Sequence, residues 1–187
     1  MSRSTVFGSS IVPFRLVFLM WLFFTLEMFY GWPISMFGII PRSLPGVIGI
    51  FVAPLVHGDI IHLVSNTIPL LFLGSVLYFF YPRLAPTVFY RGYFWTNILV
   101  WLFGRPLSRH IGASGVVYAL AFFLIFFGIF HRDFRSLAIS VIVLLMYGGL
   151  FYGILPADPQ VSWESHLAGA LVGVATAIML SGKRERV

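Results

Sequence analysis

Four polar side chains stand out because they lie inside, or at the start of, long apolar blocks: His62, Asn66, Ser114 and His166. Ionisable and strongly polar groups at membrane depth are costly, so such residues are candidates for function. Their types suit proton transfer, nucleophilic attack, hydrogen bonding or metal binding. The alternative is that they only join helices through hydrogen bonds.

The first pair is spaced as on one helix. His62 and Asn66 are four positions apart and share a face, and Asp59 is placed to cap the start of that helix. His57 lies five positions before His62, about 140° around a helix, so the two rings do not converge like an HxxxH pair. A metal or haem site that adds His166 stays an alternative, although no acid is placed as its general base.

Ser114 lies in the sequence Gly112-Ala113-Ser114-Gly115, which opens an apolar block directly after the polar residues 105–110. The two glycines leave space around the hydroxyl, which is the setting that a nucleophile needs. Small residues also let membrane helices pack closely, so this signal alone is weak.

His166 opens the last apolar block of the chain. On a helix it shares one side with Gly169 and Gly173, and these two glycines allow another helix to approach closely. A single interfacial histidine is the alternative interpretation.

The composition defines the solvent in which these residues lie. Of 187 residues, 59% are hydrophobic and only 10% are charged, and the mean hydropathy is +0.96. This excludes an ordinary soluble domain and a disordered chain, because too few polar residues exist to cover a water-soluble surface. The net charge of +6 comes from basic residues scattered singly between apolar blocks, which indicates membrane topology rather than nucleic-acid binding. The chain has no cysteine, so thiolate chemistry is excluded.

The apolar blocks predict an all-α polytopic membrane protein, a single domain over residues 1–187 with six membrane-spanning helices. Their approximate ranges are 12–30, 60–80, 86–103, 113–130, 137–155 and 163–180. With both termini inside, nine of the 12 basic residues fall on the inner side, which favours that orientation. The nine are Arg3, Arg15, Arg83, Arg91, Arg132, Arg135, Lys183, Arg184 and Arg186.

This topology brings His62, Ser114 and His166 to the outer ends of their helices, which indicates one shared site. The outer segment 32–56 is rich in proline and glycine, so we expect it to break regular helices and to lie in the membrane interface. Residues 152–162 form a second outer loop. We expect His110 to be solvated in its loop and His131 to lie at the inner face.

Together, these motifs resemble the rhomboid family of intramembrane serine proteases, in its compact bacterial six-helix form, over about residues 39–180. The resemblance implies a dyad of Ser114 as nucleophile and His166 as general base. The matching residues are His57, His62, Asn66, Gly112, Ala113, Ser114, Gly115, Tyr118, His166, Gly169 and Gly173. His62 and Asn66, with the backbone N–H of Ser114, would line an oxyanion hole.

No carboxylate is placed to orient His166, because Glu164 is two residues away on another helix face and Asp158 lies in a loop. Packing must then orient the ring, and Tyr118, one turn below Ser114, is placed to stack on it. The resemblance implies a serine endopeptidase without cofactor or metal that cleaves transmembrane proteins near the outer interface of a prokaryotic plasma membrane. The alternative is an inactive rhomboid-like pseudoprotease that binds membrane clients.

Overall fold

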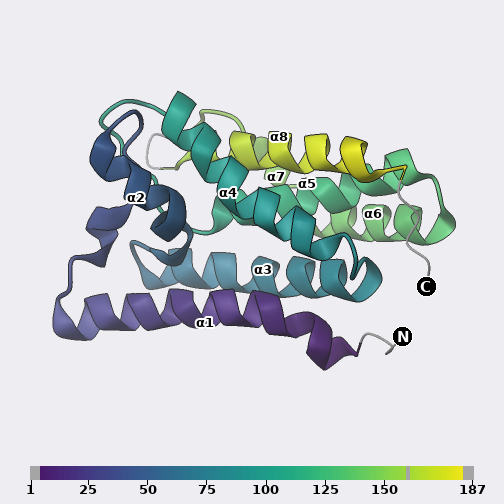
Figure 1. The fold of residues 1–187 in the computed structure, drawn as a ribbon, viewed down its shortest axis with the longest axis horizontal. Coiled ribbons are helices and arrows are strands. Elements are labelled where there is room, and N and C mark those ends of the chain that lie inside the picture. The colour runs from purple at the N-terminus through teal and green to yellow at the C-terminus, as the bar shows by residue number, and fades with distance from the viewer. Residues whose placement is uncertain (1–4, 159–160, 183–187) are drawn as a thin grey trace.

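The computed structural model describes residues 5–158 and 161–182, and the regular elements of this part are helices (Figure 1). The protein is an integral membrane protein with an all-helical bundle, as the composition predicts. Arg3, Lys183, Arg184 and Arg186, which contribute to the predicted orientation, lie outside the described residues, as does Pro159 of the loop 152–162.

The helices run back and forth along the bundle, so the start of α1 and the end of α8 lie at the same end (Figure 1). Asp59 caps α3 as predicted, because its Oδ1 accepts a hydrogen bond of 2.8 Å from the N–H of His62. The elements are α1 (Val6–Tyr30), η1 (Ile34–Phe37), α2 (Leu44–Val52), η2 (Ala53–Leu55), α3 (Ile60–Phe80), α4 (Ala85–Phe103), α5 (Ser114–His131), α6 (Phe134–Tyr147), α7 (Leu150–Gly153) and α8 (Trp163–Leu180).

Within the described residues, four helices are long and apolar enough to cross a membrane: α1, α3, α5 and α8. The helix α4 has 19 residues but contains Arg91, Thr96 and Asn97. The helix α6 has 14 residues, about 21 Å at 1.5 Å per residue, against a hydrocarbon core of about 30 Å. Six spans with both termini inside therefore stay a prediction.

The expected continuous helix over 137–155 is wrong. The chain forms α6, then a break at Gly148 and Gly149, and then the short α7. The backbone stays right-handed at both glycines, but the hydrogen bonds that follow join residues three apart instead of four. The N–H of Phe151, for example, donates to the carbonyl of Gly148 at 3.1 Å. Two adjacent residues without side chains lower the helix propensity enough to permit this break.

The expectation that the segment 32–56 lacks regular helix is also wrong, because it contains the nine-residue α2. The hydroxyl of Ser43 accepts a hydrogen bond of 3.1 Å from the N–H of Gly46, and Pro45 lies in the first turn, where it needs no donor. The helix is held to α4, because the amide of Asn97 donates to the carbonyl of Ile50 at 3.0 Å.

The helix α5 forms the centre of the bundle. In its apolar stretch, 72% of α5 is buried inside the protein, compared with 28% of α1. Close packing of α8 on α5 depends on glycines: a Cβ at Gly173 would lie 2.5 Å from the carbonyl oxygen of Ala119 and 2.9 Å from the nitrogen of Phe123. Ser114 therefore lies at the start of the most buried of the four long apolar helices.

Replacing Gly173 should therefore destabilise the bundle. In Gly173→Ala, the methyl group meets backbone atoms that cannot rotate away, so α8 must shift, at a cost of about 1–3 kcal/mol in the free energy of unfolding. Thermal unfolding in detergent micelles measures the change. Gly149→Ala is the matched control, since nothing lies within 4 Å of its added Cβ. Equal stability of the two variants would contradict this packing.

Candidate active site

The turn before α5 presents Ser114 through a glycine with a positive φ and through two hydrogen bonds that backbone N–H groups donate. Gly112 has a φ of +99°, a conformation that side-chain-bearing residues rarely adopt. Its N–H donates to the carbonyl of Ala53 at 2.9 Å, and the N–H of Ala113 donates to Nε2 of His57 at 3.5 Å. The turn is thereby fixed to the segment that precedes α3.

Ser114 and His166 meet at one end of the bundle. Ser114 is the first residue of α5 and His166 lies in the first turn of α8. Nε2 of His166 and Oγ of Ser114 are 3.0 Å apart, a hydrogen-bond distance, although the residues are 52 positions apart in the chain. This geometry allows a proton to pass from the hydroxyl to the imidazole.

The second ring nitrogen of His166 bonds to a backbone oxygen. Nδ1 lies 2.9 Å from the carbonyl oxygen of Gly153, at the C-terminus of α7, where helix carbonyls lack partners within the helix. A carbonyl only accepts, so Nδ1 carries the proton and Nε2 is left as the acceptor that faces Ser114. Sequence reasoning missed this contact, because no side chain of Gly153 takes part and no residue type signals it.

Tyr118 fixes the plane of the imidazole. Its ring and that of His166 have centroids 4.2 Å apart and an interplanar angle of 6°, a parallel stack. A Cβ at Gly169 would lie 3.0 Å from Cβ of Tyr118 and would overlap the carbonyl of Gly115. The two glycines therefore let α8 approach α5 closely enough for the stack to form.

His62 and Asn66 lie beside the turn that carries Ser114. A Cβ built on Gly112 would overlap the ring of His62 and would lie 3.4 Å from Nδ2 of Asn66. Asn66 is only 4% exposed, and within the described residues its Nδ2 has no hydrogen-bond partner. A buried donor without a partner is costly, so it is free to bind a group that enters the site.

The expectation that His110 is solvated is wrong. Its side chain is 2% exposed, and it exchanges two backbone hydrogen bonds of 2.9 Å with Ile39. Burial lowers the pKa of its imidazole, with Glu164 opposing the shift and Arg105 reinforcing it. His131 lies far along α5, where its Nδ1 is 2.6 Å from the carbonyl oxygen of Ser181.

The sequence pattern of the Rhomboid domain matches residues 45–183, a range that includes every residue of this site except Ile39. The chain belongs to the Rhomboid family. Uncharacterized proteins of Mycobacterium bovis and Mycobacterium tuberculosis are each 35% identical to it over 194 residues, covering 98% of this chain and 79% of theirs. An uncharacterized protein of Mycobacterium leprae is 36% identical over 154 residues, which is 74% of this chain and 58% of the relative. The family is one of intramembrane proteases.

In this rhomboid chain, the burial of His57 makes the stability of the folded protein depend on pH. The expectation that the rings of His57 and His62 do not converge is wrong, because His57 lies before α3 and the two ring centroids are 4.9 Å apart. Burial, and next the charge of His62, lower the pKa of His57 from 6.5 to about 4. Between these two values the unfolded chain binds more protons than the folded chain, so stability falls as the pH falls from 6.5 to 4. The total loss is on the order of 3 kcal/mol. Protonation of Nε2 also removes the acceptor of the Ala113 N–H.

His57→Gln should flatten this pH dependence, because glutamine does not titrate. Thermal unfolding of both proteins in detergent between pH 4 and 7 measures the slope. Identical slopes in the two proteins would show that His57 does not carry the proton uptake.

Proposed function

We propose that this chain is an intramembrane serine endopeptidase that cleaves transmembrane proteins near the outer face of a prokaryotic plasma membrane. The observation that carries the proposal is the 3.0 Å contact between Oγ of Ser114 and Nε2 of His166. Membership of the Rhomboid family supports the same reaction class.

In the proposed reaction, Oγ of Ser114 attacks the scissile carbonyl carbon while its proton passes to Nε2 of His166. The tetrahedral intermediate collapses, the C–N bond breaks, and His166 returns the proton to the departing amine. Water then attacks the acyl ester and gives a proton to Nε2 of His166, the bond between the acyl carbon and Oγ breaks, and His166 returns the proton to Oγ of Ser114. The carbonyl of Gly153 does the orienting work that a carboxylate performs in a triad, and it also stabilises the positive imidazolium.

The oxyanion of the intermediate needs hydrogen-bond donors, which His62, Asn66 and the backbone N–H of Ser114 would supply. The position of the first two beside Gly112 supports this role. Such donors stabilise the transition state more than the ground state, because the negative charge develops only there.

Hydrolysis also needs water, so the site must open toward the outer aqueous phase. The loop that follows Gly153 would act as a lid over it. A transmembrane helix hides its carbonyls in backbone hydrogen bonds, so a substrate must unwind locally before it reaches Ser114. We therefore expect cleavage near the outer interface, at sites with small or helix-breaking residues.

Reconstitution tests the proposal. The purified protein is placed in liposomes with a fluorescent model substrate that has one transmembrane helix with glycine or proline at the outer interface. The proposal predicts turnover and a cleavage site within the juxtamembrane part of the helix. Binding of the substrate without turnover would instead identify a pseudoprotease that holds membrane clients.

A further inference from the structure

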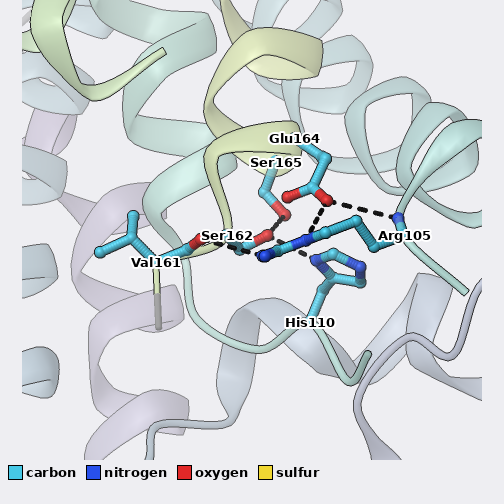
Figure 2. A network of polar contacts seen from close by, with 6 residues as sticks. All are labelled: Arg105, His110, Val161, Ser162, Glu164 and Ser165. Atoms are coloured by element: carbon cyan, nitrogen blue, oxygen red, sulfur yellow. Dashed lines mark hydrogen bonds and ion pairs between the residues drawn. The ribbon is translucent and has the colours of Figure 1, made fainter. Parts of the chain in front are cut away.

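A second polar network lies next to the proposed dyad, between the loop 104–113 and the start of α8 (Figure 2). We call it the Arg105–Glu164 network. It consists of Arg105, His110, Val161, Ser162, Glu164 and Ser165.

Arg105 joins the two segments at three points. Its backbone N–H donates to Oε1 of Glu164 at 3.3 Å, and its Nε donates to the same oxygen at 2.5 Å. Its Nη2 also donates to the carbonyl of Val161 at 3.1 Å. The Glu164 side chain is 8% exposed and the Arg105 side chain 36%, so the carboxylate is the buried partner and depends on the arginine for compensation.

Two serines connect the segments a second time. Nδ1 of His110 lies 2.6 Å from Oγ of Ser162, and that oxygen lies 2.6 Å from Oγ of Ser165. A Cβ on Gly115 would lie 3.7 Å from Cβ of Ser165 and 3.2 Å from its carbonyl oxygen, so Ser165 also packs on the residue after Ser114. Figure 2 shows these side chains converging between the loop and α8.

The position of this network gives it a consequence for the dyad. The loop 104–113 ends directly at Ser114, and Glu164 is two residues before His166. Each segment therefore carries one member of the dyad, and the network fixes the distance between the segments. A displacement of about 1 Å between reacting groups can lower a rate by about 10²-fold.

We propose that Glu164, held by Arg105, is a positioning residue that fixes the loop carrying Ser114 against the helix carrying His166. This inference rests on the proposed protease function. The Glu164 carboxylate bonds to Arg105, whereas Nδ1 of His166 bonds to the carbonyl of Gly153. Glu164 therefore acts on the dyad through the backbone of the two segments and not as the third member of a triad.

The test compares four variants with the wild type in the reconstituted cleavage assay. Glu164→Gln and the double variant Arg105→Gln/Glu164→Gln remove the ion pair, and the double variant leaves no buried charge unpaired. Arg105→Lys keeps the charge pair. Arg109→Gln is the matched control, because it removes a positive charge from the same loop at an exposed residue.

Both ion-pair variants should lower kcat about 10- to 100-fold, with KM changed by less than about twofold because substrate contacts remain. The rate of labelling of Ser114 by a fluorophosphonate should fall in parallel. Arg105→Lys should retain most of the wild-type kcat, and Arg109→Gln should equal the wild type.

Wild-type kcat in either ion-pair variant would overturn the proposal, as would an equal loss in Arg109→Gln. If Glu164→Gln alone does not fold, the double variant decides. A wild-type protein that neither cleaves nor labels would refute the protease function itself, whereas an active wild type with active ion-pair variants refutes only the positioning role.

Discussion

Ser114→Ala and His166→Ala should each lower the rate of substrate cleavage by at least about 10³-fold. The first removes the attacking oxygen, and the second removes the base that lies 3.0 Å from it. Because the two residues act as one unit, the double variant should be hardly slower than either single variant. Initial rates in proteoliposomes measure the effect.

Each dyad variant has a matched control. Ser65→Ala removes an exposed hydroxyl whose hydrogen bond goes to the carbonyl of His62 within its own helix. His131→Ala removes an imidazole that bonds to Ser181 at the opposite end of α5. Both should cleave at near the wild-type rate. If Ser114→Ala cleaved the substrate as fast as Ser65→Ala does, Ser114 would not be the nucleophile.

Loss of an oxyanion donor should have the second largest effect. Asn66→Asp keeps the size of the side chain but replaces the Nδ2 donor by an oxygen, and His62→Ala removes its ring. Each should lower kcat by about 10²–10³-fold with little change in KM, because the bond is made only in the transition state. Steady-state kinetics over a range of substrate concentrations separates the two parameters.

A neighbouring residue of α3 provides the control for this prediction. Thr67→Ala removes a hydroxyl that accepts a hydrogen bond from Nε1 of Trp21, on the side of α3 that faces α1. It should leave kcat unchanged. If Asn66→Asp raised KM and left kcat intact, Asn66 would be a substrate-binding residue rather than an oxyanion donor.

The all-helical membrane bundle was predictable, because composition and the length of apolar blocks are properties of many residues together and no single contact decides them. The meeting of Ser114 with His166 followed from a topology set by charge together with a family resemblance. The structure puts the two atoms 3.0 Å apart, while their catalytic role stays a proposal. The cap at Asp59 was predictable because N-capping is local.

The remaining features depend on contacts that residue types do not signal. The break at Gly148 and Gly149 lies in an uninterrupted apolar block, and Gly153 acts through its carbonyl. Glu164 was set aside because it faces away from His166, although that direction points it at Arg105. The helix α2 could have been predicted from its N-cap Ser43 and the proline in its first turn, but the many glycines and prolines of the segment argued against a helix.

Activity-probe labelling tests the central claim most directly. The reconstituted protein is treated with a fluorophosphonate, which loses fluoride when a nucleophilic oxygen attacks its phosphorus, and the modified peptide is mapped by mass spectrometry. We predict a single adduct on Ser114 that disappears in His166→Ala. An adduct on another residue, or equal labelling of Ser114 without His166, would contradict the proposed serine–histidine mechanism.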